Sequence, residues 1–270
     1  MGRFWSFLFL MVPILGVAVF VAAASGWPAN HWLPVDVSAH GHVIDGLFYF
    51  ILWLTGIIFV GTSLVLFWVL WTYDAEVTTE PVVFTHGSHT LEVVWSIIPA
   101  ATLLFIAIYQ MPEWYANKLG RPTIDVGGVP TPKPALAEVT GRQFEWRIRY
   151  AGKDGLIGTP DDIHVVNDLH VPLQEDVVLE IKAQDVLHSF FLPHLRVKQD
   201  VVPGMRQYVW FRATRPGSFD IVCAELCGWG HYKMKGRITI ESKEDFDKWL
   251  QDTEDHQNTS QFTPAPVEGE

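Results

Sequence analysis

Basic residues are almost absent from the first 117 residues of the chain. Arg3 is the only Lys or Arg before Lys118. Over the whole chain 18% of residues are charged, against about 25% in an ordinary soluble domain. This composition excludes a purely soluble protein. The formal net charge of −11 and the lack of a basic patch exclude a nucleic-acid binder, and two cysteines are too few for a disulfide-rich scaffold.

Three long apolar stretches precede residue 112, at residues 4–24, 47–71 and 93–111. A helix of roughly 20 residues, rising about 1.5 Å per residue, spans a hydrocarbon core about 30 Å thick. The second and third stretches therefore predict a transmembrane helical hairpin. The first is either an extra N-terminal helix or a signal peptide, because Ala22-Ala23-Ala24-Ser25 fits an A-x-A cleavage site.

A change in composition near residue 112 separates a membrane part from a water-exposed part. We expect an N-terminal apolar segment at 1–25, a transmembrane hairpin at 26–111, a linker at 112–134, an all-β domain at 135–251 and a disordered tail at 252–270. Short strand-like runs separated by Pro-Gly turns predict an antiparallel sandwich or barrel for the β domain. The Gly- and Asp-rich segment 154–162 fits a hairpin tip better than a calcium loop.

The segment from Cys223 to Met234 carries the most chemical information in the sequence. It reads Cys-Ala-Glu-Leu-Cys-Gly-Trp-Gly-His-Tyr-Lys-Met and offers two thiolates, an imidazole and a thioether within twelve residues. His188, at a strand end, offers a second imidazole. Donors of this kind bind copper or zinc in preference to magnesium or calcium.

Three kinds of structure are compatible with these donors. Cys223 and Cys227 could form a disulfide, as the cysteines of exported domains often do. Two cysteines and two histidines could hold a tetrahedral zinc ion. Copper is favoured by Met234, because thioethers prefer copper to zinc. Two copper ions sharing the thiolates would make a centre suited to electron transfer.

The pattern Cys-x-Glu-x-Cys-x3-His-x2-Met, with a histidine 35 residues before the first cysteine, resembles the binuclear copper A site of cytochrome c oxidase subunit 2. The resemblance covers about residues 40–250. It includes the segments Asp185-Val-Leu-His188-Ser, Lys198-x-Asp200-x-x-Pro203-Gly204 and Leu91-Glu92-Val-Val-Trp95-x-Ile-x-Pro99. It implies a cupredoxin-like β-sandwich outside the membrane, following a transmembrane hairpin.

The resemblance also implies a role for each donor. The copper ligands would be His188, Cys223, Glu225, Cys227, His231 and Met234. The two cysteines would bridge two copper ions, and each histidine would bind one ion. Met234 and the backbone carbonyl of Glu225 would be weak outer ligands. The Glu225 side chain would reach a magnesium ion shared with subunit 1.

Glu92 lies at the start of the third apolar stretch. From its position it is either a solvated residue favoured by the helix dipole or a carboxylate that feeds a proton path. The family resemblance matches Glu92 to the glutamate at the mouth of a proton path into subunit 1. We therefore expect Glu92 to be the entrance of that path.

The segment 143–146 departs from the family pattern. The family has Gln-Trp-x-Trp there, and its first Trp receives the electron from cytochrome c, whereas this chain reads Gln143-Phe144-Glu145-Trp146. Phe144 and Trp146 are thus candidates for receiving the electron. The alternative is that both are structural aromatic residues of the sandwich.

The resemblance predicts the electron-accepting subunit of a respiratory haem–copper oxygen reductase, a proton-translocating oxidoreductase. Cytochrome c or another exoplasmic donor would reduce the copper pair by single electrons, and haem in subunit 1 would reduce oxygen to water. The expected location is a bacterial inner membrane, with the copper domain on the periplasmic side and other oxidase subunits alongside. The alternative is a membrane-anchored copper-binding or copper-delivery protein without an oxidase partner.

Overall fold

The chain forms two compact units. The computed structural model describes residues 2–27, 32–74, 76, 78–79, 81, 84 and 86–259. One unit comprises Met1–Pro34 and Asp45–Met111, and the other comprises Val35–Ile44 and Pro112–Glu270. The short segment Val35–Ile44 therefore belongs to the same unit as the C-terminal part of the chain.

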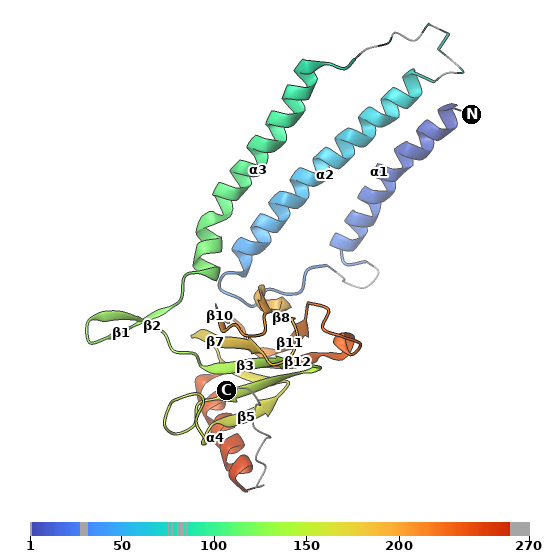
Figure 1. Ribbon diagram of the computed structural model, residues 1–270. Helices are drawn as coiled ribbons and strands as arrows, with labels where there is room; N and C mark the ends of the chain where they lie inside the picture. Colours follow the sequence, from blue (N-terminus) through green and yellow to red (C-terminus); the bar gives the residue numbers. More distant parts are fainter. Residues whose placement is uncertain are drawn as a thin grey trace. The chain divides into compact units, whose positions relative to one another are not determined.

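Three long apolar helices dominate the first unit (Figure 1). They are α1 (Gly2–Ala24), α2 (Gly41–Thr72) and α3 (His89–Lys118). Ring pairs such as Phe7 with Trp71 (5.3 Å between centroids) and Phe50 with Phe105 (6.2 Å) join neighbouring helices. Each helix is long and apolar enough to cross a membrane, which confirms the three apolar helices predicted from the sequence.

The second unit contains a sandwich of two five-stranded sheets (Figure 1). One sheet has the order β10 (Gln207–Arg212), β7 (Asp176–Ala183), β3 (Ala137–Arg142), β4 (Glu145–Tyr150) and β5 (Ile163–Val166). The other has the order β6 (Asp168–Pro172), β12 (Lys235–Glu241), β11 (Gly217–Cys223), β8 (His188–Leu192) and β9 (Val197–Val201). The predicted sandwich is confirmed. Its sheets are mixed, because β3 pairs with β7 and β6 with β12 in parallel.

Alternating side chains along β4 show how the sequence builds the core. Trp146, Ile148 and Tyr150 point inward and are at most 1% exposed, whereas the charged residues between them lie on the outer face. Burial of each such side chain contributes about 2–3 kcal/mol to stability. The same core extends to Cys223 and Met234, so the sulfur-bearing segment is anchored in the best-packed part of the unit.

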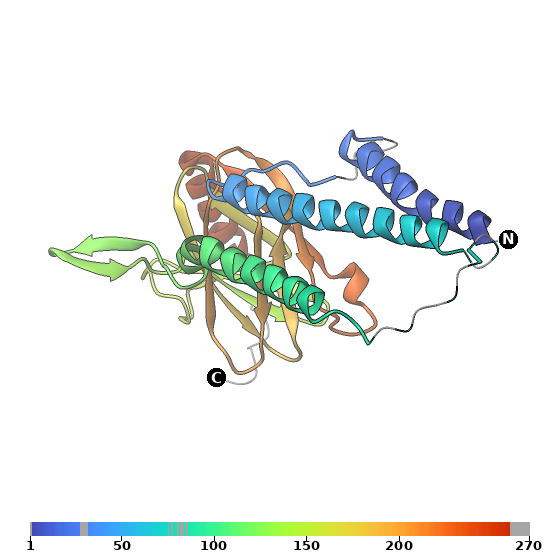
Figure 2. The same ribbon diagram turned by 90° about the horizontal axis from the view of Figure 1, so that it is seen from above.

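The expected linker at 112–134 contains regular structure. Helix α3 continues to Lys118, and β1 (Thr123–Val126) and β2 (Val129–Pro132) form a hairpin that projects beyond the sandwich (Figure 2). Gly127 and Gly128 turn the chain with φ values of 65° and 86°. A two-residue glycine turn of this kind is favoured in hairpins because its twist matches that of the strands.

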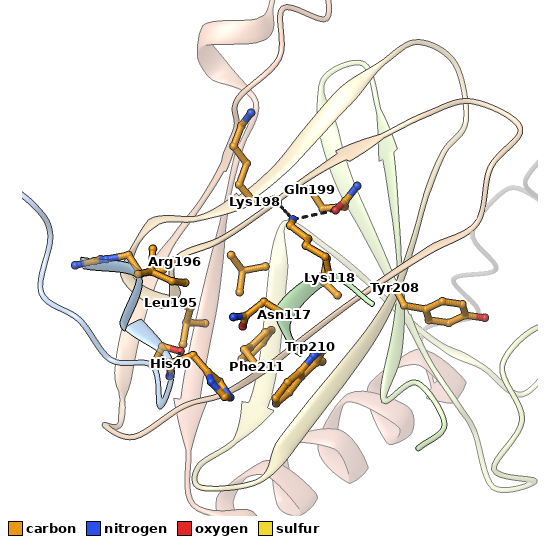
Figure 3. Close-up of a pocket in the computed structure, with 14 residues that line it drawn as sticks. His40, Asn117, Lys118, Leu195, Arg196, Lys198, Gln199, Tyr208, Trp210 and Phe211 are labelled. Carbon is orange, nitrogen blue, oxygen red and sulfur yellow. Dashed lines mark hydrogen bonds between the residues drawn. The ribbon is translucent and has the colours of Figure 1, made fainter. Parts of the chain in front are cut away.

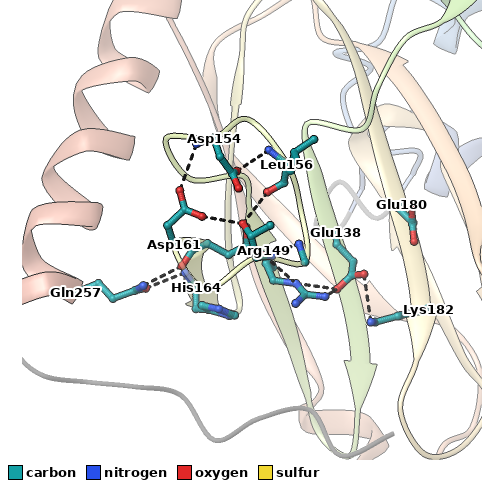
Figure 4. A network of polar contacts seen from close by, with 12 residues as sticks. Glu138, Arg149, Asp154, Leu156, Asp161, His164, Glu180, Lys182 and Gln257 are labelled. Atoms are coloured by element: carbon teal, nitrogen blue, oxygen red, sulfur yellow. Dashed lines mark hydrogen bonds and ion pairs between the residues drawn. The ribbon is translucent and has the colours of Figure 1, made fainter. Parts of the chain in front are cut away.

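A C-terminal helix extends into the segment expected to be a disordered tail. Helix α4 runs over Lys243–Thr259, so residues 252–259 of the expected disordered tail are helical, and residues 260–270 lie outside the described part. Phe246 is buried in the core. Gln257 donates to the carbonyl of Asp162 (2.8 Å) and accepts from the His164 N–H (2.9 Å) (Figure 4). These tertiary contacts hold a helix whose polar composition alone predicts little order.

A polar cluster links the first sheet to the loop 152–162. Glu138 is almost fully buried, and its carboxylate pairs with Arg149 (2.7 Å) and Lys182 (3.1 Å) (Figure 4). Within the loop, Asp161 accepts from the Asp154 N–H at 3.2 Å. The aspartates of this loop are thus engaged by its own backbone, as expected of a hairpin connection.

The last turn of α3 contacts both sheets of the sandwich beside a cavity of about 240 Å³ (Figure 3). Trp210 Nε1 donates to the carbonyl of Ala116 (3.1 Å), and Lys118 Nζ donates to Gln199 Oε1 (3.0 Å). His40 lies edge-on to the Trp210 ring at 4.8 Å. The start of α2 and the end of α3 are therefore both tied to the sandwich unit.

Candidate metal centre

The end of β11, the loop that follows it and the start of β8 lie together at one end of the sandwich. Cys223 is the last residue of β11, Met234 directly precedes β12, and His188 is the first residue of β8. The Cys223 N–H donates to the Met234 carbonyl at 3.2 Å and closes the base of the loop. Gly228 has a φ of 136°, which only glycine adopts readily, so the chain can reverse there.

Two sulfur atoms and two imidazole nitrogens converge at this end. Cys223 Sγ and Cys227 Sγ are 3.8 Å apart. His188 Nδ1 lies 3.9 Å from Cys223 Sγ, and His231 Nδ1 lies 3.6 Å from Cys227 Sγ. The ligand atoms of His188, Cys223 and Cys227 all lie within 4.8 Å of one another, and all three residues are buried. Each histidine therefore flanks a different sulfur.

Two weaker donors complete the arrangement. Met234 Sδ lies 3.8 Å from Cys227 Sγ, and its side chain is 1% exposed. The backbone carbonyl oxygen of Glu225 lies 3.3 Å from Cys223 Sγ. The structure thus gathers all six donors that the sequence pattern predicted.

The geometry and the donor types suit a pair of copper ions. Both cysteines are free, and their 3.8 Å separation is nearly twice the length of a disulfide bond, about 2.0 Å. Two thiolates each about 2.3 Å from one metal ion can be this far apart. Six donors exceed the four of a structural zinc site, and a thioether among them favours copper.

Asp185 fixes the orientation of His188. The His188 ring is fully buried, and its Nε2 donates to Asp185 Oδ1 at 2.8 Å, which leaves Nδ1 facing the sulfur. Asp185 Oδ2 accepts from the Gln143 N–H at 2.8 Å. Burial opposes ionisation of Asp185, but these hydrogen bonds outweigh it and lower the pKa of the carboxyl group. A carboxylate on the far ring nitrogen is the usual support of a metal-binding histidine.

The two thiols ionise as a coupled pair. Burial opposes ionisation of Cys223, but hydrogen bonds from His188 and nearby backbone groups outweigh it and lower the pKa of this thiol. Burial, together with the charge of Cys223, raises the pKa of the Cys227 thiol. Because thiolates are the metal-binding form, a metal ion has to displace the proton of Cys227.

Trp146, one of the two candidates for receiving the electron, does not reach the surface. Its side chain is 0% exposed, because the alternation of β4 turns it into the core. The ring lies edge-on to Phe190 (5.3 Å) and 6.1 Å from the His188 ring, so it packs behind a candidate ligand.

The other two candidates lie outside the donor cluster. Phe144 is half-buried, and its ring is 5.2 Å from that of Trp229. Glu92 is exposed in the first turn of α3, in the helical unit. The structure therefore places Phe144 beside the ligand loop, and the proton role of Glu92 stays a prediction.

Three residues in or beside the donor cluster were not singled out by sequence reasoning. Asp185 orients His188, and the side-chain amide of Gln143 donates to the carbonyl of Cys227. Trp229 stands between two glycines in the ligand loop and is 82% exposed. Trp229 could have been found from the sequence, because a large aromatic residue within a Gly-x-Gly turn is unusual. The contact of Gln143 could not, because it joins residues 84 positions apart.

Two family models match most of the chain. The model described as "Cytochrome C oxidase subunit II, periplasmic domain" matches residues 139–242. The model described as "Cytochrome C oxidase subunit II, transmembrane domain" matches residues 26–112. The chain is therefore a membrane protein whose sandwich is of the periplasmic type.

Two relatives agree with these matches, and one solved structure is also similar. An alternative cytochrome c oxidase subunit 2 from Bradyrhizobium diazoefficiens is 38% identical over 136 residues, which is 42% of this chain and about half (49%) of that relative. A cytochrome c oxidase subunit 2 from Thermostichus vulcanus is 29% identical over 284 residues, covering 87% of this chain and 83% of the relative. The solved periplasmic domain of subunit II of a Bradyrhizobium japonicum cytochrome oxidase is 26% identical, covers 46% of this chain and 97% of that one, and has a TM-score of 0.41.

Proposed function

Because this chain belongs to the cytochrome c oxidase subunit II family, we propose that it is the electron-accepting subunit of a membrane-bound haem–copper oxidase. The observation that carries the proposal is the convergence of six donors around Cys223 and Cys227, with the two sulfurs 3.8 Å apart. The family implies a copper A centre, and the donors present here fit one.

Each donor has a defined task in this centre. The thiolates of Cys223 and Cys227 would hold two copper ions, and His188 and His231 would be their nitrogen ligands. Met234 and the Glu225 carbonyl would be weak outer ligands. When bound, a copper pair of this kind supplies one-electron redox chemistry. The protein contributes a buried, pre-formed donor set, because Asp185 holds His188 and the glycine turn holds the loop.

The remaining assignments concern the partner proteins. The electron donor is cytochrome c or another periplasmic redox protein, and the acceptor is haem in subunit 1. The half-buried Glu225 side chain offers a carboxylate oxygen, the donor type that magnesium prefers, for an ion shared with subunit 1. The exposed Glu92, at the start of an apolar helix, is the entrance of a proton path into subunit 1.

Location follows from the same reasoning. The membrane is the inner membrane of a bacterium, as the bacterial sources of the relatives suggest, and the sandwich unit lies on its periplasmic side. The single basic residue before Lys118 gives little independent information on orientation.

The test is purification of the full-length tagged chain from native membranes in a mild detergent. We expect a haem-containing partner to copurify, and the complex to consume oxygen when supplied with reduced cytochrome c. A chain that retained copper but copurified with no haem protein would contradict the proposal and support a copper-delivery role.

A further inference from the structure

Trp229 is unusually exposed for a tryptophan beside a buried cluster. It is 82% exposed and separated by one glycine from each of two candidate ligands, Cys227 and His231. A solvent-exposed indole beside a buried cluster adds little to the stability of the isolated chain. Large exposed apolar side chains mark surfaces that a partner covers, and tryptophan is enriched at the centre of such surfaces.

The Trp229 side chain packs against a second loop, the one between β3 and β4. Its ring meets the ring of Phe144 edge to face, at 5.2 Å between centroids and 68° between planes. A Cβ atom on Gly230 would lie 2.5 Å from the Phe144 ring, so only glycine allows this approach. Gln143, next to Phe144, donates to the Cys227 carbonyl. Phe144 therefore supports the indole, while the neighbouring Gln143 side chain holds the ligand loop.

Further apolar side chains of the two ligand-bearing loops are exposed around this position. On the loop of Trp229 they are Leu226 (76% exposed) and Tyr232 (68%); beside His188 they are Val186 (37%) and Leu187 (38%). The metal-bearing end of the sandwich thus exposes apolar side chains from both of its loops. A partner that docks there through apolar contact should associate with a weak dependence on ionic strength.

We infer that Trp229 is the contact residue for the one-electron donor protein, and that Phe144 is its positioning residue. The inference rests on the proposed function, because a one-electron donor has to come close to the loop that carries the ligands. The partner is a haem protein with an exposed haem edge, since a flat apolar edge can pack on the indole. In the step, ferrous haem becomes ferric and the metal centre gains one electron. No bond forms or breaks, and no proton moves.

The test uses the whole oxidase complex carrying Trp229→Ala, with a soluble ferrous mono-haem cytochrome c as the probe. We expect its second-order rate constant for reducing the complex to fall about tenfold or more, as for loss of an interface hot spot. The affinity for the ferric cytochrome, measured without electron transfer, should weaken by a similar factor. Reduction by hexaammineruthenium(II), which needs no docking surface, should change less than twofold.

Three companion variants sharpen the result. Trp229→Phe should recover part of the rate. Phe144→Leu should slow the cytochrome reaction by a smaller factor and leave both the ruthenium reaction and the copper spectrum unchanged. Leu156→Ala removes a side chain that is 62% exposed in the loop after β4, at the opposite end of that strand from Phe144, and should have no effect.

Equal cytochrome rates for the wild type and Trp229→Ala would overturn the inference while leaving the proposed function intact. Equal slowing by both reductants, or loss of the chain from the complex, would overturn it as well, because Trp229 would then serve the centre or the assembly. A wild-type complex that accepts electrons from ruthenium but from no haem protein would contradict the proposed function itself.

Discussion

Single atoms decide what the metal-bearing end of the sandwich can bind. Both histidines direct Nδ1 toward a sulfur, and for His188 this choice follows from the hydrogen bond between Nε2 and Asp185. Asp185 is in turn held by the Gln143 N–H. Gln143, which supports the His188 ligand through Asp185, is therefore the neighbour of Phe144, which packs against the exposed Trp229. The segment 143–144 thus contacts both the donor cluster and the surface beside it.

Asp185→Asn tests this support. The amide keeps the size of the carboxylate but removes the charge that fixes the His188 tautomer, so copper affinity should fall about 10- to 100-fold. Competition with a copper chelator on the full-length chain measures the change. Asp220→Asn makes the same charge change at an exposed position of β11, three residues before Cys223, and should leave the affinity unaltered. Equal affinities for Asp185→Asn and wild type would show that the carboxylate does not orient the ligand.

The sequence indicated which candidate donors lie together, whereas it did not indicate what surrounds them. Spacing alone brought Cys223, Cys227, His231 and Met234 onto one loop, because glycines allow that loop to close on itself. The packing of Phe144 under Trp229 joins two loops 85 residues apart in sequence, and only the register of β3, β4 and β11 brings them together. The burial of Trp146 required knowing which face of β4 is turned inward.

Among the elements, α4 shows how tertiary contacts override local composition. Its acidic, polar sequence led to the expectation of a disordered tail after residue 251. In the structure, the Trp249 ring stacks on the His170 ring of β6 at 3.8 Å and 4°. Gln257, within residues 252–259, likewise contacts Asp162 and His164. Such contacts depend on distant strands and loops, so the sequence of the helix alone could not predict them. The β1–β2 hairpin is the opposite case, because local sequence was enough to predict it. Its Gly-Gly turn lies in the segment that was expected to be a linker.

The stack on α4 should depend on pH. His170 Nδ1 lies 2.7 Å from Glu241 Oε1, and its Nε2 lies 3.4 Å from Asp168 Oδ1. Burial lowers the pKa of the imidazole, but the hydrogen bonds to Asp168 and Glu241 outweigh it, and the net pKa is raised. The charged form is thus favoured by folding, so its stabilisation is fully present below about pH 6.5 and is lost as pH rises through the folded-state pKa.

His170→Gln should therefore weaken α4 more at pH 5.5 than at pH 9. At the lower pH we expect a loss of about 1.5 kcal/mol, typical of a hydrogen bond to a charged group. Hydrogen exchange of the α4 amides in the full chain measures it. His164 is a matched control, because burial and the nearby Arg149 lower the pKa of its imidazole. The effect of His164→Gln should then grow as pH rises. Identical pH profiles for the two variants would contradict the assignment.

Over the whole molecule, charge and hydrophobicity divide along the chain as the function requires. The apolar helices carry one basic residue before Lys118, and the acidic sandwich unit carries the donors. The overall net charge of −11 favours attraction of a basic donor, and the exposed side chains at the metal-bearing end include the large apolar ones of Leu226, Trp229 and Tyr232. The docking contact proposed for the donor is made by these apolar groups, so its dependence on ionic strength should be weak.

The central claim is that two copper ions share the sulfurs of Cys223 and Cys227. An electron spin resonance spectrum of the oxidised complex tests it most directly, because one unpaired electron shared equally by two copper nuclei gives seven hyperfine lines. We predict a seven-line spectrum and two copper ions bound by this chain. A four-line spectrum from a single copper ion, or a silent site filled by zinc, would contradict the account.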